Sequence, residues 1–382
     1  MTNQHMSQMT VGINGAGAIS DIFLENMISR FEILKVKSIC SRKFEKAEQK
    51  ADQYGIQATT HEAMLLDPEI DIIVNLTPAD AHFEIIKAAL EAGKHVFTEK
   101  AMAETYQQAE ALCQLADEKG LHLGSAPETF MGSACQTGLK AVREGMTGEI
   151  TSFHIQANRN LDLLTSFSPS LRVPGGGIGM DYGIYYLTEV LSILGPVQQV
   201  AGIRKNPKPV RNNCIPNHPE FGQEYTIADE TQLYGFLELA SGICGTIHLN
   251  GESILQDEGG IEIFGKKGIL RLPCANYMGG DVAFAPESRD WSKRTAETVL
   301  ENMFSFSDNS RGIGVADMAW AIRQGKRTRA SKEMAAHAVE VFEALYQSSE
   351  DGMRKTISST FEIPEAMPEH FEVGREESYF IG

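Results

Sequence analysis

A glycine-rich turn between a short apolar strand and an amphipathic helix constrains the fold of this chain more than any other feature. The run from Thr10 to Ser20 reads TVGINGAGAIS, and a helix is predicted over Ala18–Arg30. Gly15 supplies the tight turn, and Gly17 has no side chain to keep a pyrophosphate from the backbone. Ala18 and Ile19 begin the helix, whose first N–H groups can bind phosphates. An ordinary tight turn is the alternative, but the strand–turn–helix context favours a dinucleotide site.

Length and charge narrow the classes of protein further. A chain of 382 residues favours two domains, and its net charge of −17 argues against nucleic acid or an anionic membrane as a partner. The first nine residues are polar and no apolar run reaches the roughly 20 residues of a membrane helix, so we expect neither a secretory signal nor a membrane span. Six scattered cysteines without a C-x-x-C pair are typical of a reducing compartment. We therefore expect a cytoplasmic protein.

The order of predicted elements changes along the chain. As far as about residue 127, strands and helices alternate, which predicts a parallel sheet with helices on both faces. Beyond it, strands follow one another through glycine-containing turns, which predicts a largely antiparallel sheet. Long loops are expected over Lys205–Gln223 and Asn276–Ser310, and late helices over Gly314–Arg323 and Lys332–Tyr346. We expect a dinucleotide-binding domain over residues 9–129 and a second domain over residues 130–382.

The carboxyl ends of the strands predict where the chemistry lies, because ligands of open parallel sheets bind there. Five segments follow successive predicted strands and should line one edge: Asn14–Gly17, Ser41-Arg42, Thr77-Pro78, Glu99-Lys100 and Ala126–Glu128.

The second strand lacks the acid that usually binds the ribose of NAD. Ser41 and Arg42 follow this strand, and Lys43 and Lys46 follow in the next helix. A guanidinium can bind a phosphate with two hydrogen bonds. We therefore expect a preference for NADP over NAD, the alternative being a helix cap followed by solvated basic residues.

Two further segments carry candidate catalytic groups. Glu99 and Lys100 form an acid–base pair at an apolar strand end, where a structural ion pair and a catalytic pair are about equally favoured. Asp181 and Tyr185, four residues apart after a glycine run, can project from one helical face. Taken alone, a helix-capping aspartate and core tyrosines explain that segment better. A catalytic interpretation requires both side chains to meet Lys100 across a domain cleft.

Other catalytic classes find little support. The histidines lack metal-ligand spacing, so we predict no metal site. No serine elbow or Cys/His arrangement indicates a hydrolase.

These segments together resemble the glucose–fructose oxidoreductase/inositol dehydrogenase (Gfo/Idh/MocA) family over nearly the whole chain. The resemblance implies an α/β fold: an N-terminal Rossmann domain and a C-terminal α+β domain with an open, mostly antiparallel sheet, through which homodimers or homotetramers form. Ala101 stands where the family motif has proline, and Tyr185 where it often has histidine, as in the branch that uses tyrosine. Cofactor-binding residues implied by the resemblance and the strand ends are Gly15, Gly17, Ala18, Ile19, Ser41, Arg42, Lys46, Thr77, Pro78, His82, Glu99 and Lys100.

The implied reaction is hydride transfer between NADP, or NAD, and a carbinol carbon of a sugar, polyol or related cyclic alcohol. Tyr185 would be the acid/base, Lys100 would favour its phenolate, and Asp181 would orient Lys100 or bind substrate. Glu128, Asn158 and Arg159 are candidates for the substrate pocket. Three alternatives stay open: Lys100 itself as acid/base, a non-catalytic cofactor-binding sensor, and reduction of an imine or pyrrole-type substrate.

Overall fold

The computed structural model describes residues 8–255, 258–288, 290 and 295–369. Its contacts divide the chain into two compact units. The first runs to Met131, resumes over Asn309–Ala336 and takes in the described residues from Met367; the second comprises Gly132–Asp308 and His337–Ala366. The division at Met131 lies close to the expected boundary at residue 129. The return of Asn309–Ala336 differs from the expected range 130–382, parts of which (256–257, 289, 291–294 and 370–382) lie outside the described residues.

The first unit is built on a six-stranded parallel sheet in the order β3-β2-β1-β4-β5-β6. Its strands are β1 (Met9–Asn14), β2 (Leu34–Cys40), β3 (Gln57–Ala58), β4 (Ile72–Asn75), β5 (His95–Thr98) and β6 (Leu123–Ser125). The helices between them are α1 (Ile19–Ser29), α2 (Phe44–Tyr54), α3 (His61–Leu66), α4 (His82–Glu91) and α5 (Tyr106–Lys119). This confirms the doubly covered parallel sheet expected from the alternating pattern.

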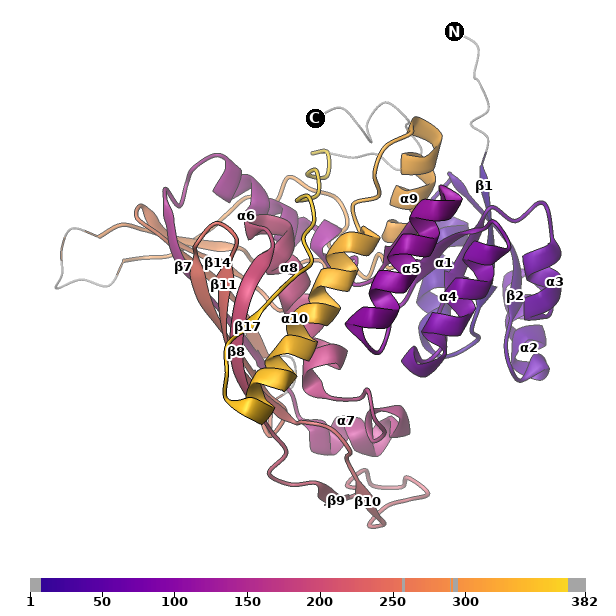
Figure 1. The fold of residues 1–382 in the computed structure, drawn as a ribbon, viewed down its shortest axis with the longest axis horizontal. Coiled ribbons are helices and arrows are strands. Elements are labelled where there is room, and N and C mark those ends of the chain that lie inside the picture. Colours follow the sequence, from indigo (N-terminus) through magenta and orange to yellow (C-terminus); the bar gives the residue numbers. More distant parts are fainter. Residues whose placement is uncertain (1–7, 256–257, 289, 291–294, 370–382) are drawn as a thin grey trace, which may run out of the picture. The chain divides into compact units, whose positions relative to one another are not determined.

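Helices cover both faces of this sheet. On one face, α4 and α5 lie side by side (Figure 1) over buried residues such as Ile73 and Val96. On the other, α9 (Ile313–Gln324) packs so closely that a Cβ on Gly314 would overlap the ring of Phe97. Although α9 comes late in the sequence, it therefore covers the second face of the sheet in the first unit.

The second unit is built on a nine-stranded sheet in the order β16-β15-β14-β13-β7-β12-β11-β8-β17. All neighbouring pairs are antiparallel except β7 with β12, so the expected mostly antiparallel sheet is confirmed. The strands are β7 (Ile150–Asn158), β8 (Val197–Lys205), β11 (Gln232–Leu239), β12 (Cys244–Asn250), β13 (Glu258–Gly265), β14 (Gly268–Leu272), β15 (Ala283–Pro286), β16 (Thr298–Val299) and β17 (Lys355–Thr356).

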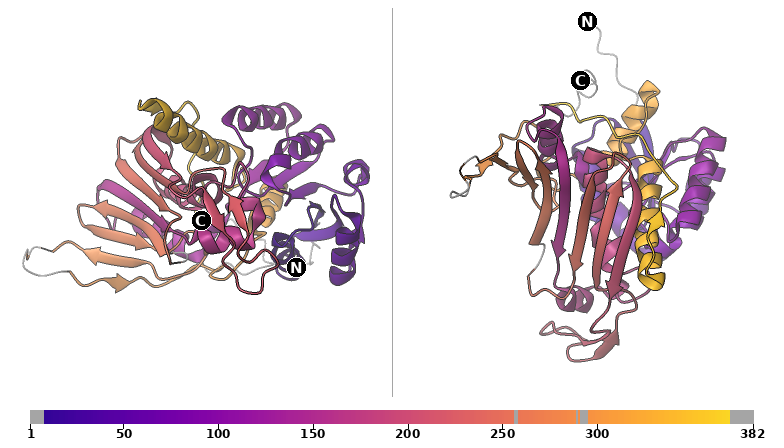
Figure 2. Two further views of the ribbon diagram at one scale, coloured as in Figure 1. Left: turned by 90° about the horizontal axis from the view of Figure 1, so that it is seen from below. Right: turned by 60° about the vertical axis from the view of Figure 1, so that its left-hand side comes forward.

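Only one face of this sheet is covered by helices. These are α6 (Ser133–Arg143), α8 (Ile184–Leu194) and α10 (Lys332–Asp351). The right-hand view of Figure 2 shows the opposite face, on which no helix lies in the described part of the chain. Alternation along β7 fits this arrangement: Phe153, Ile155 and Ala157 are buried, while Gln156 is exposed. In the described residues, no helix is long and apolar enough to cross a membrane.

In the described part of the chain, three short strands lie inside the expected loops 205–223 and 276–310, and two further short elements were not predicted. A small hairpin of β9 (Val210–Asn212) and β10 (Glu224–Thr226) lies beside α7 (Leu161–Phe167) at the lower end of the second unit (Figure 1). The strands β15 and β16 fall inside the expected loop 276–310, part of which (289 and 291–294) lies outside the described residues. These elements are two to seven residues long, too short for a periodic apolar pattern to reveal them.

Candidate active site

Backbone hydrogen bonds join the ends of five parallel strands in the first unit. The N–H of Gly15 donates to Cys40 O (2.9 Å), and that of Leu76 to Asn14 O (2.7 Å). The N–H of Glu99 donates to Asn75 O (2.8 Å), and that of Ala126 to Thr98 O (2.9 Å). The structure thus brings the five segments selected from the sequence to one edge of the sheet, where parallel sheets bind their ligands.

The glycine loop at this edge has the geometry of a phosphate cradle. Gly15 has a φ of +115°, and a Cβ there would lie 2.6 Å from the carbonyl oxygen of Leu76. A Cβ on Gly17 would meet nothing within 4 Å, so its backbone faces open space. Ser20, which follows Gly15 and Gly17 as the third small residue of the glycine-rich turn, donates its hydroxyl proton to Gly17 O (2.7 Å) and so holds the loop. The N-cap residue Ala18 makes no side-chain cap hydrogen bond, so the N-cap side chain does not compete with a phosphate for the N-terminus of α1.

The end of β2 carries the predicted basic residues and one group that the sequence argument missed. Arg42 and Lys46 are exposed and Ser41 is half-buried; Lys43, rather than Ser41, occupies the N-cap position of α2. From α3, His61 Nδ1 lies 2.9 Å from Asn14 Nδ2, while the Cys40 thiol donates to Asn14 Oδ1. Burial lowers the pKa of His61 and raises that of the Cys40 thiol to about 12. His61 therefore belongs to the candidate dinucleotide edge; only an expected third βα unit could have indicated it.

His82 braces two of the strand-end segments from within. Its Nε2 lies 2.9 Å from Thr77 O and its Nδ1 lies 2.7 Å from Ala101 O, and the ring is 1% exposed. Only a doubly protonated ring donates to both carbonyls at once, yet burial lowers the pKa of His82. Both ring nitrogens of His82 thus face backbone carbonyls, so the ring supports the two strand-end segments that carry Thr77 and Ala101.

A short chain of side-chain hydrogen bonds holds the loop at Thr77 in place. The Thr77 hydroxyl donates to Asn75 Oδ1 (2.8 Å), and Asn75 Nδ2 donates to Thr98 Oγ1 (3.0 Å). This chain joins the loop that begins with Thr77-Pro78 to the end of β5, immediately before Glu99-Lys100. The two segments therefore have a fixed separation within the first unit.

Two acids share this edge of the sheet with Lys100: Glu99, which precedes it in the sequence, and Glu128, which follows β6. The Lys100 N–H donates to Glu99 Oε2 (3.1 Å), and a cis peptide bond joins Lys100 to Ala101. Glu128, a predicted substrate residue, is 2% exposed, and its Oε1 accepts the N–H of Gly312 at the start of α9 (2.9 Å). Burial, and then the nearby Glu99, raises the pKa of Glu128 to about 7. In this structure Glu128 anchors α9.

The other predicted catalytic and substrate residues lie in the second unit, around a short π-helix, η4 (Gly179–Gly183), which directly precedes α8. We call this segment the π-turn. Asp181 lies in this π-turn, a kind of helix irregularity that is frequent at functional sites. Arg159, just beyond the end of β7, places Nη1 3.4 Å from Asp181 Oδ2 and its guanidinium 4.0 Å from the centre of the Tyr182 ring. The Tyr185 ring lies 6.4 Å from that of Tyr182, measured between centroids.

The three catalytic residues expected to meet belong to different units: Lys100 to the first, Asp181 and Tyr185 to the second. The structure brings Asp181 and Arg159 together, with Tyr185 one turn further along. Asn158, the last residue of β7, directly precedes Arg159, and its Oδ1 accepts from Asn250 Nδ2 (3.3 Å). Lys100 belongs to the first unit. Its meeting with Asp181 and Tyr185 stays a prediction.

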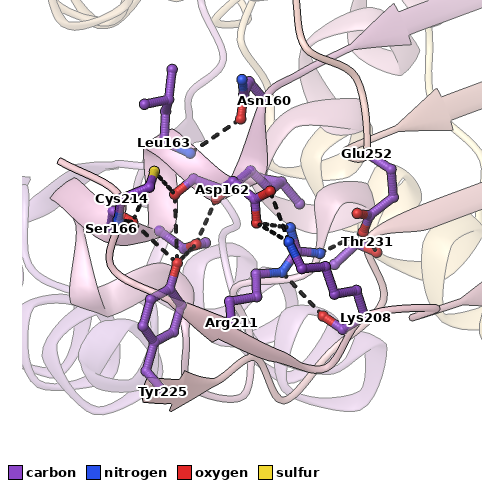
Figure 3. Close-up of polar contacts among 12 residues, drawn as sticks. Asn160, Asp162, Leu163, Ser166, Lys208, Arg211, Cys214, Tyr225, Thr231 and Glu252 are labelled. Carbon is purple, nitrogen blue, oxygen red and sulfur yellow. Dashed lines mark hydrogen bonds and ion pairs between the residues drawn. The ribbon is translucent and has the colours of Figure 1, made fainter. Parts of the chain in front are cut away.

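A buried ion network supports the segment that follows Arg159. Arg211 of β9 is 1% exposed and binds Asp162 Oδ1 of α7 (2.8 Å) and Glu252 Oε1 (2.5 Å). Figure 3 shows this guanidinium between the two carboxylates, with Thr231 donating to the same Glu252 oxygen. The hairpin is thereby fastened to both α7 and the turn after β12. None of these residues was selected from the sequence.

Among the residues that the structure describes, no group of three or more histidine, cysteine or acidic side chains is arranged to hold a metal ion. The glycine cradle, by contrast, fits a dinucleotide.

Comparison with protein families agrees with this geometry. A model described as "Oxidoreductase family, NAD-binding Rossmann fold" (GFO_IDH_MocA) matches residues 9–126. Its companion, the "C-terminal alpha/beta domain" of the same oxidoreductase family, matches residues 140–357. Together the two models cover most of both units.

Individual relatives match over different lengths. The uncharacterized oxidoreductase YhhX of Escherichia coli (strain K12) is 33% identical over 165 residues, 42% of this chain and 46% of its own length. The aligned segment thus spans about half of the first curated relatives. The D-glucoside 3-dehydrogenase of the same strain is 25% identical over 356 residues, which cover 91% of this chain and 97% of that protein. A solved levoglucosan dehydrogenase in complex with NADH superposes with a TM-score of 0.79 at 18% identity, over 92% of this chain and 100% of that chain.

Proposed function

The chain belongs to the Gfo/Idh/MocA family of oxidoreductases, and on this premise we propose that it transfers hydride between NADP and a carbinol carbon of a sugar, polyol or related cyclic alcohol. The observation that carries this proposal is the shared edge of the first unit, where the glycine cradle follows β1 and Lys100 follows β5, with only β4 between the two strands. The name of the D-glucoside 3-dehydrogenase supports a carbohydrate substrate.

The cofactor would be held by the glycine loop, the N-terminus of α1 and the end of β2. When bound, its nicotinamide would supply the hydride acceptor or donor. Gly15, Gly17, Ala18 and Ile19 would hold the phosphates, and Ser41, Arg42 and Lys46 the adenosine end. The absence of an acid directly after β2 and the two exposed cations support NADP over NAD. Thr77, Pro78 and Glu99 would contact the cofactor further along the edge, and His82 would hold this part of it in place.

Proton transfer would fall to Tyr185. Its phenol would take the proton of the substrate hydroxyl, or return it in the reverse direction. An unperturbed tyrosine titrates near about 10, so it needs a neighbouring cation to act near neutral pH. The Lys100 ammonium would serve, and would also stabilise negative charge on the reacting oxygen. Asp181, paired with Arg159, would orient Lys100 or bind a substrate hydroxyl, and Asn158 would line the same pocket.

The test is oxidation of NADPH and NADH across a panel of keto-sugars, and the reverse reaction with the matching alcohols. Tyr185→Phe and Lys100→Met should each lower kcat by about 100-fold or more, since positioned proton transfer contributes that much. Lys87→Met and Tyr277→Phe, which alter an exposed lysine of α4 and an exposed tyrosine of the second unit, are the matched controls. Unchanged turnover in both test variants would remove these roles.

Three rival functions give different results in the same assay. A much greater loss for Lys100→Met than for Tyr185→Phe would make the lysine the acid/base. Tight NADP binding without turnover of any carbonyl would indicate a cofactor-bound sensor. Turnover of cyclic imines but not of keto-sugars would indicate an imine or pyrrole-type reductase.

We also propose a homodimer or homotetramer formed through the sheet of the second unit. The helix-free face carries Ile203 and Tyr234, which are 54% and 39% exposed. Such side chains on an uncovered sheet favour association with another sheet. Light scattering of the native chain and of Ile203→Glu tests the assembly: a monomeric native chain would contradict it.

We also propose a cytoplasmic location, which is supported by the six cysteines, all of them free thiols.

A further inference from the structure

A buried carboxylate that the proposed reaction does not use lies beneath the π-turn. Glu230, just before β11, is 5% exposed, and its Oε1 accepts the N–H of Gly179, the first residue of the turn (3.0 Å). Its backbone carbonyl accepts the N–H of Ile178 (3.1 Å). Glu230 thus binds the two residues that lead into the turn, one through its side chain and one through its main chain.

Tyr346 of α10 completes this support. Its hydroxyl donates to the same Glu230 oxygen (2.8 Å). Burial raises the pKa of Glu230 and, still more, that of Tyr346. The first N–H groups of a helix have no partner within the helix, and the Glu230 carboxylate supplies one to Gly179. Asp181 lies two residues further along.

The glycine run is explained by the same contacts. A Cβ on Gly177 would lie 2.5 Å from both carboxylate oxygens of Glu230, and a Cβ on Gly179 would overlap the Tyr346 hydroxyl. The backbone can therefore approach Glu230 only without side chains at these positions. From the sequence alone, the run indicated close approach of the backbone without naming a partner. The structure identifies that partner as a buried acid.

We propose that Glu230 and Tyr346 are positioning residues, which fix the π-turn so that the Asp181 carboxylate is held in register for the reaction. This inference rests on the role proposed above for Asp181. The carboxylate is then constrained from two directions: Arg159 pairs with its Oδ2, while Glu230 and Tyr346 fix the backbone that carries it. Displacement of a catalytic group by about 1 Å can lower turnover about 100-fold, so support of this kind matters for kcat.

The experiment is a double-mutant cycle between Glu230 and Asp181 in the full chain. The variants are Glu230→Ala, Glu230→Gln, Asp181→Asn and the double variants, assayed for kcat, KM of the alcohol and binding of NADPH by fluorescence. We expect Glu230→Ala to lower kcat about 10-fold or more while NADPH binding is unchanged. Glu230→Gln, whose amide oxygen can still accept both hydrogen bonds, should stay within about 3-fold of the native kcat.

The effect of the double variants on kcat distinguishes a positioning role of Glu230 from a general loss of structure. If Glu230 acts through Asp181, then Glu230→Ala should add little to Asp181→Asn, because the carboxylate to be positioned is already gone. Asp229→Ala is the matched control: its carboxylate binds the N–H of Gly175 at the outer end of the glycine run, away from the π-turn. This control should change kcat by less than about 2-fold.

The outcomes distinguish this inference from the proposed function. Full turnover in Asp181→Asn would overturn the role of Asp181 and this inference with it. Loss of turnover in Asp181→Asn with native kcat in Glu230→Ala, or multiplicative losses in the double variant, would overturn the positioning role alone. Should Glu230→Ala not fold, Tyr346→Phe carries the same test, because it removes one of the two supports. Native kcat in Tyr346→Phe would then overturn the inference.

Discussion

Arg159 Nη1 lies 3.4 Å from Asp181 Oδ2 and thereby joins the end of β7 to the π-turn. The two side chains are 14% and 21% exposed, so the pair is shielded from solvent without being fully buried. From the sequence, Arg159 was a candidate substrate residue and Asp181 a catalytic one. Their pairing means that substitution of either one alters the electrostatics of the other.

Arg159→Met should lower both stability and turnover. It removes the ion pair and the stacking of the guanidinium on Tyr182. We expect a loss of about 1 kcal/mol in the free energy of unfolding, the upper range for a partly exposed pair. Denaturant unfolding and kcat measure the two effects. Lys266→Met, which removes an exposed pair with Glu149, is the control, and an equal fall of kcat in both variants would contradict a local role for Arg159.

Gly15→Ala and Gly17→Ala form a matched pair that separates folding from cofactor binding. At Gly15 the positive φ and the nearby Leu76 carbonyl make a Cβ strained, so we expect a loss of about 2 kcal/mol or more of stability. At Gly17 a Cβ meets no protein atom, so stability should be nearly native while the KM for NADPH rises about 10-fold. Thermal unfolding and steady-state kinetics give the answer. Native KM in Gly17→Ala would mean that phosphate does not approach this backbone.

Arg42→Ala should weaken NADPH binding much more than NADH binding. A charge-assisted hydrogen bond contributes about 1.5–3 kcal/mol, which corresponds to at least about 10-fold in the KM for NADPH. Lys35→Ala, an exposed residue of β2 outside the strand-end segments, makes the same change of net charge and serves as control. Equal effects of Arg42→Ala on the two cofactors would contradict recognition of a 2′-phosphate.

His82→Leu should disturb the edge on both sides of the imidazole. The variant leaves the carbonyls of Thr77 and Ala101 without their contacts to the ring, at a cost of about 1–3 kcal/mol for buried groups. We expect weaker NADPH binding and a lower kcat together, because the Thr77 loop and Lys100 are both affected. His82→Asn, which retains a donor, should recover part of the activity. Native values of both parameters in His82→Leu would show that the ring only fills space.

Glu128 should make the stability of the first unit depend on pH. Its pKa is about 7 in the folded chain and near about 4.3 when unfolded, so protonation stabilises the fold. This contribution is complete below about pH 4.3 and is lost as the pH rises through about 7, by at most about 1.4 kcal/mol per pH unit. Glu128→Gln keeps an acceptor for Gly312 and should lack this dependence. Parallel stability profiles of the native chain and the variant between pH 5 and pH 8 would contradict the burial effect.

The elements that the sequence predicted well are those with a strong local pattern. The sequence pattern predicts a helix over Phe44–Tyr54 and a strand over His95–Thr98, and α2 and β5 have these bounds. An amphipathic period and a buried apolar run are strong local signals. Strand β3 and helix α3 were missed, since residues 57–66 are too few for either period. The missed helix α7 is seven residues long, and its N-cap Asn160 was the one local signal for it.

The site shows a similar division. Strand ends selected the segments from Gly15 to Glu128 because a parallel sheet brings its carboxyl ends to one edge. Glu230 could not be found in this way, since it acts on the backbone of Gly179, which lies 51 residues earlier in the sequence. Glu128 was found as a strand-end residue and remains a candidate for the substrate pocket, but its bond to Gly312, which spans 184 residues, could not be foreseen. Contacts between a side chain and a distant backbone leave no periodic trace in a sequence.

The return of Asn309–Ala336 to the first unit also sets the order in which that unit can be completed during synthesis. When residue 131 leaves the ribosome, all six strands of the sheet have been synthesised, but Gly314, which packs against the Phe97 ring, has not. The nascent N-terminal portion must therefore wait for almost two hundred further residues before its last helix arrives. A fragment cut at residue 131 would keep the apolar face around Phe97 exposed permanently, and should aggregate rather than serve as an isolated nucleotide-binding module.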